Sequence, residues 1–182
     1  KLALPERTMD PLRPHVRRVI GERGNLGAAL AEIAAHARDR KLFERHASSL
    51  EDPDMHDGCR IIVDATHDVV KAAEAAATQR PAVLESMDPL AALIVVAELL
   101  RTDREAAARR IHEALEPETR RVLPLETLRT PPADLESLDL PFESKALLAQ
   151  AAARRATDAE ERERLLALAR RYDVLQYVVP AR

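Results

Sequence analysis

Histidine and aspartate side chains that could bind a metal ion gather in the first half of the chain. His56-Asp57 and His67-Asp68 each place an imidazole next to a carboxylate, and His46 lies upstream of both. Divalent ions bind such nitrogen and oxygen donors when the fold brings several of them together. A metal-dependent hydrolase with its site at His46, His56, Asp57 and His67 is therefore one hypothesis.

The expected helical periodicity weighs against that hypothesis. A helix is predicted from about residue 58 to residue 79. Its apolar stripe consists of Ile62, Val69, Ala73 and Ala76. At about 100° per residue, Asp64 and His67 lie opposite this stripe and are expected to face solvent. His56 and Asp57 are expected in a loop over residues 51–58, which is dense in turn-forming residues. Surface histidines are the alternative interpretation, and we expect no bound metal or cofactor.

Two further patterns have the outline of catalytic motifs. Cys59 is the only cysteine, which excludes an internal disulfide and a cysteine-based zinc site. Together with His56 it offers a nucleophile and a base, but no third orienting group accompanies them. The spacing of Gly21, Gly24 and Gly27 lacks the Lys-Ser/Thr of a phosphate loop, and a helix end followed by a helix start explains it better. Neither pattern predicts catalysis.

A basic segment near the N-terminus suggests a different function. Arg13, Arg17, Arg18 and Arg23 could contact nucleic acid or an acidic partner. Two helices with a glycine-containing turn between residues 14 and 38 would allow a helix-turn-helix. The second of them, however, presents alanines rather than the Arg, Asn or Gln that read base edges. With a formal net charge of −3, the chain also has no overall attraction for DNA. A DNA-binding regulator is the first alternative.

The composition predicts an all-α fold. Hydrophobic residues make up 46% of the chain and are mostly Ala, Leu and Val, while four glycines are too few for a protein of tight β-turns. Aromatic residues contribute only 2%, without Trp, so an aromatic-lined ligand pocket is not expected. No apolar stretch has the features of a secretory signal or the roughly 20 residues that span a bilayer. We expect a cytoplasmic protein without membrane contact, and the abundance of Ala, Arg and Leu suggests a bacterial genome.

The stretch that begins at Asp88 is expected to organise the fold. Asp88 can cap a helix, and Pro89 suits the first helical position because its missing N–H is no loss there. Between Leu90 and Leu100 the only polar residue is Glu98. A helix over about 89–101 that is apolar nearly all round belongs inside a bundle. We therefore predict a multi-helix bundle with this helix at its centre.

The remaining segments are predicted to complete a single α-helical domain over residues 1–182. An extended arm over 1–13 precedes a helical core over 14–116. Closely spaced prolines mark a crossover over 117–141, through which no regular helix can persist. A C-terminal helical hairpin is expected over 142–179.

Two Thr-Asp-x-Glu segments match the spacing of a capping box. They begin at Thr102 and Thr157, and each is expected to start a helix by satisfying backbone N–H groups. Both follow a helix that is expected to begin at a proline, which leaves open a diverged repeat of two helical hairpins.

The surface features favour a protein that assembles with others. Alanine-rich faces on the helices expected over 58–79 and 142–155 allow close helix packing. The C-terminal segment is more apolar than a chain end usually is, and Tyr172, Leu175 and Val178 form a candidate interaction surface. We expect a helical protein–protein interaction or regulatory module that binds another protein or itself as a homo-oligomer, without catalysis of its own.

Overall fold

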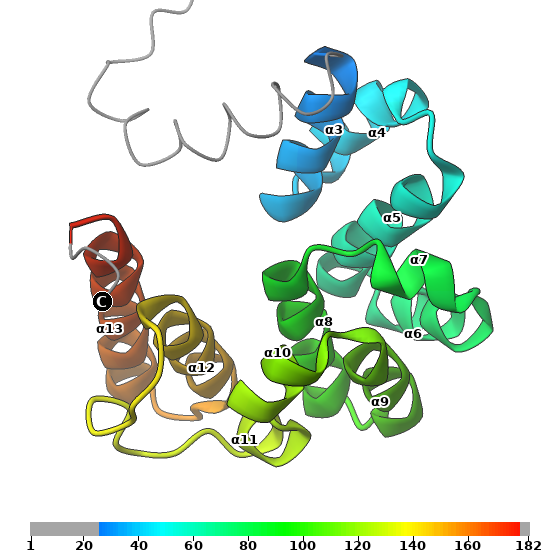
Figure 1. Cartoon of the computed structure of the whole chain (residues 1–182). Coiled ribbons are helices and arrows are strands. Elements are labelled where there is room, and N and C mark those ends of the chain that lie inside the picture. Colours follow the sequence, from blue (N-terminus) through cyan, green and yellow to red (C-terminus); the bar gives the residue numbers. More distant parts are fainter. Residues whose placement is uncertain (1–25, 179–182) are drawn as a thin grey trace, which may run out of the picture.

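The computed structural model of this protein describes residues 26–178, and side chains over 26–173. Within this part every regular element is a helix, which confirms the predicted all-α fold. Figure 1 shows these helices following one another around an open arc, with α3 and α4 at one end and α12 and α13 at the other. Over the described residues, no helix combines the length and the apolar character that crossing a membrane requires.

The arc begins with two short helices joined at a left-handed residue. Helices α3 (Leu26–His36) and α4 (Arg40–His46) are followed by the 3₁₀ turn η1 (Ala47–Ser49). Arg38 has a φ of 56°, and the side chain of Asp39 accepts a hydrogen bond from the N–H of Leu42 to cap α4. The sequence predicts a break near Asp39, because the apolar stripe that runs from Leu26 to Ala37 fails at Arg40 and Lys41, and the structure confirms it.

The region predicted as one helix over 58–79 is two helices. Helix α5 spans Pro53–His67 and α6 spans Val69–Thr78. Asp68 separates them, because its N–H closes α5 on the carbonyl of Asp64 at 2.6 Å while its carboxylate caps α6 at the N–H of Lys71, 3.2 Å away. The predicted loop over 51–58 was also wrong, since Asp52 caps α5 and His56 and Asp57 lie within that helix.

Helix α5 lies unusually close to the short helix α7 (Pro81–Glu85), and Gly58 makes this possible. A Cβ atom at Gly58 would lie 3.1 to 3.2 Å from atoms of the neighbouring segment. The atoms it would meet are Ser86 Oγ, Met87 Cγ and the backbone oxygen of Val83. One of the three is backbone, so a larger side chain here would push α5 and α7 apart.

Helix α8 (Pro89–Arg101) contacts helices on several of its sides. Asp88 caps it as expected, with its carboxylate 3.0 Å from the N–H of Ala91. The helix packs against α5, α6, α9, α11 and α12. Its burial is incomplete, because Leu90 is 41% exposed and Ile94 is only partly buried. Both side chains line a cavity of about 120 Å³ beside α5 and the end of α3.

Neither predicted capping box forms. Thr102 instead ends α8, and its hydroxyl donates to the carbonyls of Glu98 and Leu99. The chain then turns through Asp103, whose φ is 58°, before α9 (Glu105–Ala114) begins without a side-chain cap. In the second segment it is Asp158, and not Thr157, whose carboxylate accepts from the N–H of Glu161 at 2.7 Å.

The proline-rich crossover lies on the core and contains two short helices, α10 (Pro117–Val122) and α11 (Leu125–Arg129). Leu123, Leu128 and Leu135 are at most 2% exposed, so the segment is anchored by leucines. The His112 side chain of α9 fastens it as well, since Nε2 lies 2.9 Å from the carbonyl of Leu123 and donates to it.

The chain ends in the predicted helical hairpin. Helices α12 (Phe142–Arg155) and α13 (Ala159–Val178) pack against each other, joined by a tight turn (Figure 1). The hairpin also contacts the rest of the protein through α8 and α11. Its placement leaves space between α13 and the α5–α8 side of the arc, where a groove opens.

The buried apolar side chains fall into two clusters, and α5 contributes to both. The larger cluster runs from α5 to α13, with Ile61 and Ile62 among its members. The smaller one joins α3 and α4 to α5, where Cys59 and Val63 meet Phe43. Helix α5 therefore attaches α3 and α4 to the remainder of the fold.

Candidate functional site

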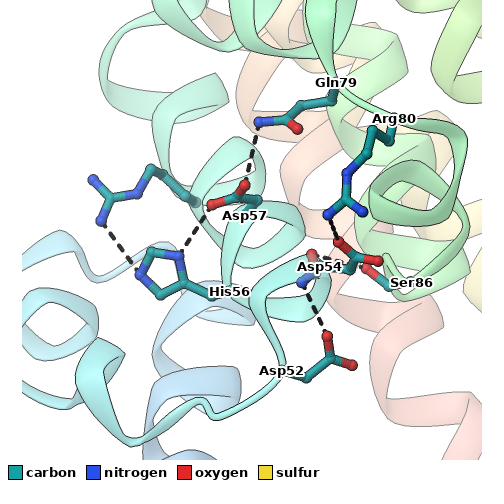
Figure 2. Close-up of polar contacts among 8 residues, drawn as sticks. Asp52, Asp54, His56, Asp57, Gln79, Arg80 and Ser86 are labelled. Atoms are coloured by element: carbon teal, nitrogen blue, oxygen red, sulfur yellow. Dashed lines mark hydrogen bonds and ion pairs between the residues drawn. The ribbon is translucent and has the colours of Figure 1, made fainter.

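The His-Asp pair near the start of α5 forms a local hydrogen-bonded unit. His56 Nδ1 lies 3.1 Å from Asp57 Oδ1, and its Nε2 lies 3.5 Å from a guanidinium nitrogen of Arg60. Because arginine can only donate, this arrangement favours the tautomer that carries its proton on Nδ1. Asp57 Oδ2 also accepts from the side-chain amide of Gln79 at 3.3 Å, as Figure 2 shows.

The surrounding polar groups connect α5 to the segment that carries α7. Asp54 pairs with Arg80 (Figure 2). Ser86 Oγ donates to the carbonyls of Asp54 and Val83 at 3.1 and 2.8 Å. The N–H of Asp54 is bonded to the carboxylate of Asp52 at 2.9 Å. Asp54 and Asp57 therefore link α5 to residues 79–86, so we interpret the cluster as a structural clamp rather than a catalytic dyad.

The structure does not bring the four candidate metal ligands together. His67 is at the far end of α5 from His56, roughly 16 Å away along the helix axis. Its Nε2 contacts the carbonyl of Arg38 at 2.8 Å. His46 lies at the end of α4. Among the described side chains, no group of three or more His, Cys, Asp or Glu residues could hold a metal ion.

Two residues near these histidines are buried rather than available for chemistry. Asp64, which was expected to face solvent, is 4% exposed because α4 covers that side of α5. Its carboxylate pairs with Arg40 at 2.6 Å and with Lys71 at 3.3 Å, so it joins α4, α5 and α6. Cys59 is 7% exposed and belongs to the smaller apolar cluster.

A groove of about 510 Å³ opens between α5, α8 and the C-terminal hairpin. Its lining residues come from α5, α6, α8, α12 and α13, and Figure 1 shows α8 facing α12 and α13 across the inner side of the arc. Its apolar lining consists of Ala65, Val69, Ala153 and Leu166. Its polar lining consists of Thr66, His67, Glu98, Arg101, Arg154 and Arg162. We call this recess the inner groove.

Glu98 is the buried centre of the inner groove. The residue is 5% exposed, and its two carboxylate oxygens bind different arginines. Oε2 accepts from Arg101 Nε at 3.0 Å, one turn further along α8, while Oε1 pairs with Arg154 from α12. The carboxylate thus links α8 to the hairpin. A guanidinium has five N–H donors, so these pairs use only part of the hydrogen-bonding capacity of Arg101 and Arg154.

The inner groove is positively charged. Three arginines line it against the single carboxylate of Glu98, although the whole chain has a formal charge of −3. Arg38 lines a smaller adjoining cavity of about 120 Å³ together with Glu98, Leu90 and Ile94. Burial lowers the pKa values of Arg38 and Arg154 below their ordinary value, and the neighbouring charge of Arg38 lowers that of Arg154 further. Arginine keeps its charge despite such shifts.

Basic side chains at three converging helix ends line the groove. His67, Arg101 and Arg154 each stand in the last turn of α5, α8 and α12, where basic side chains offset the negative end of the helix dipole. Each position is therefore favourable for its own helix. What the fold adds is that three such ends meet at one groove.

Of the candidate interaction residues at the C-terminus, Tyr172 is buried. Tyr172 is 4% exposed, and its ring lies 6.1 Å from that of Phe142, while Lys145 Nζ lies 5.9 Å from the ring centre. Tyr172 therefore packs within the hairpin, which corrects the prediction for this residue. The side chains of Leu175 and Val178 lie outside those that the structure describes.

The basic N-terminal candidates Arg13, Arg17, Arg18 and Arg23 also lie outside the described residues. Comparison with known proteins gives no further guide, because no family model, curated protein or solved structure matches this chain. The inner groove is thus the candidate site, and of its polar residues the sequence had drawn attention only to His67 and to Glu98, the lone polar residue of α8.

Proposed function

We propose that this protein is a helical protein–protein interaction module that binds its partner in the inner groove. The carrying observation is the lining of this groove, where apolar side chains from α5, α6, α12 and α13 stand beside exposed guanidinium groups. Apolar surface supplies affinity and charged groups at its edge supply specificity, which is the composition typical of a protein-binding surface.

The groove's charged lining favours binding over acid–base catalysis. Arginine side chains stay protonated at any physiological pH, so Arg101, Arg154 and Arg162 are suited to attract charge rather than to transfer protons. The His56–Asp57 pair lies outside this lining, and Asp57 is bonded to Gln79 at the end of α6. The partner is another protein or a second copy of the chain.

Site-specific photo-crosslinking tests this proposal. Thr66 is exposed and lines the inner groove, whereas Thr78 is exposed at the end of α6 and does not line it. A photoreactive residue in place of Thr66 should give a discrete adduct in native extract, and the same residue in place of Thr78 should not. The mass of the adduct distinguishes another protein from a second copy, and sedimentation of the purified chain checks self-association.

A groove variant makes the crosslinking experiment specific. Leu166 is partly buried and lines the groove, so Leu166→Asn removes apolar contact area without adding charge. In the variant that carries the photoreactive residue at position 66, this substitution should reduce the yield of the adduct by about fivefold, as expected when roughly 1 kcal/mol of apolar contact is lost. Equal adducts from positions 66 and 78, or an adduct that Leu166→Asn leaves unchanged, would refute the groove as the binding surface.

A further inference from the structure

Resting on the proposed function, we infer that the occupant of the inner groove is an amphipathic helix that carries carboxylates along one edge of its apolar face. The inference starts from charge. Arg101, Arg154 and Arg162 line the groove together with one carboxylate, which leaves an excess of two positive charges there. A partner segment with acidic side chains would complete this charge distribution, and a basic segment would be repelled.

Glu98 holds the arginine side chains of the groove in position for such a partner. Both of its oxygens are already paired, one with Arg101 and one with Arg154, and the carboxylate is almost fully buried. These contacts hold two flexible side chains in fixed positions before any ligand arrives. Prearranged donors lose less conformational freedom on binding, so incoming carboxylates are bound more tightly than by unrestrained surface arginines.

The apolar lining defines the other face of the partner. Ala65 and Ala153 are buried small residues at the base of the groove, while Val69 and Leu166 are partly buried. Small side chains at the base leave room for a larger apolar side chain from outside. The groove's volume of about 510 Å³ falls within the range of roughly 300–1,000 Å³ that binding pockets have. One or two leucine-sized side chains therefore fit the chemistry of the lining.

A helix suits these walls better than a strand or a nucleic acid. The described part of the chain has no strand, so it offers no sheet edge to which a β-strand could be added. Parallel or crossing helices on both sides of a groove are the setting in which an amphipathic helix inserts. Nucleic acid is less well matched, because the lining contains no Phe, Tyr or Trp side chain for base stacking and the chain as a whole is negatively charged.

Designed peptides test the inference directly. The probe is a fluorescent peptide of about 15 residues with Leu and Ala on one face and Glu at i, i+4 spacing along its edge. Its matched control has Gln at every Glu position. Binding of each to the full chain is measured by anisotropy. The acidic peptide should bind at least about tenfold more tightly than the Gln peptide, because charge-assisted hydrogen bonds to guanidinium are lost.

Two arginines on the same helix provide the matched variants. Arg162 lines the groove, whereas Arg164 lies two residues further along α13 and pairs with Glu161 outside it. Arg162→Gln should weaken the acidic peptide by about fivefold to tenfold and leave the Gln peptide unchanged. Arg164→Gln should bind both peptides as the parent does. Circular dichroism of each variant checks that the helices persist.

The outcomes separate this inference from the proposed function. If both peptides bind equally and Leu166→Asn weakens both, the groove binds helices but the acidic chemistry is refuted. If neither peptide binds while Thr66 still yields its specific adduct, the partner is not an acidic helix and the interaction module stands. If duplex DNA displaces the acidic peptide at lower concentration than the Gln peptide does, the groove recognises nucleic acid and the inference is overturned.

Discussion

Replacing Glu98 with Gln tests whether one buried carboxylate fastens the C-terminal hairpin to α8. The substitution keeps the size of the side chain but removes the charge that binds Arg101 and Arg154. Hydrogen bonds to charged groups contribute about 1.5–3 kcal/mol each. The arginine side chains are 42% and 33% exposed, so water can replace part of what they lose. We therefore expect a total loss of about 2 kcal/mol, below the roughly 3–5 kcal/mol for a fully buried pair.

Urea unfolding and thermal melting measure this loss. For a domain of this size, about 2 kcal/mol lowers the melting temperature by roughly 4–8 °C. The matched control is Glu161→Gln, which removes an exposed pair with Arg164 on α13 and should leave the melting temperature unchanged. A double-mutant cycle with Arg154→Gln isolates the bond across the groove. If Glu98→Gln has the melting temperature of the parent, or the cycle shows no coupling energy, Glu98 does not fasten the hairpin to α8.

Three further predictions follow from contacts elsewhere in the fold. Asp64→Asn should lower the free energy of unfolding by about 1–2 kcal/mol, because the pairs of Asp64 with Arg40 and Lys71 join three helices and both cations are partly exposed. Urea denaturation measures this loss. The control Asp68→Asn keeps a side chain that can cap α6 and should lower the free energy of unfolding by less. Gly58→Val should cost more than about 1 kcal/mol, since its Cβ would lie 3.1 to 3.2 Å from atoms of the α7 segment; an unchanged urea midpoint would contradict the close approach. Hydrogen bonds, first from Arg129 and then from Arg109, hold the pKa of Glu105 below its ordinary value. The stability that this carboxylate contributes is therefore present above its unfolded-state pKa and is lost as pH falls through the lowered folded-state pKa, so Glu105→Gln should flatten the acid side of the stability profile.

Patterns that depend on one helix at a time were predictable from the sequence. The all-α class followed from composition, and the start of α8 followed from Asp88 and Pro89. The break at Asp39 followed from a stripe that stopped at Arg40. In each case the deciding interaction lies within one turn of the residue concerned, so the sequence contains the whole of it.

Errors arose where a residue could serve either of two neighbouring elements. Asp68 could continue a helix on its periodicity, yet it ends α5 and caps α6. Thr102 has the spacing of a capping box, yet its hydroxyl bonds back to α8 because Asp103 adopts a left-handed conformation. Helical periodicity also predicted that Asp64 faces solvent, because the periodicity of one helix does not show that α4 packs over that side of α5.

The inner groove could not be derived from spacing at all. Arg101 and Arg154 lie on helices far apart in the sequence, and each is explained locally as a basic residue in a last helical turn. Only the isolated Glu98 in an apolar helix was a signal. A lone carboxylate among apolar residues predicts that a cation from elsewhere must meet it, but not from which helix.

The division of the core into two clusters has a consequence for how the protein opens. The seam between α3 and the rest is built mainly from alanine side chains such as Ala28, Ala31, Ala34 and Ala35, which bury little apolar area each. The larger cluster is held by Leu, Ile and Val. We therefore expect α3 and α4 to open locally at a lower free energy than α8, so that their amide hydrogens exchange with solvent while those of α8 stay protected. Arg38 and His36 line the cavity beside the inner groove. A ligand in the groove that also contacted these residues would slow amide exchange in α3 and α4, although the hairpin of α12 and α13 that it binds lies at the opposite end of the arc.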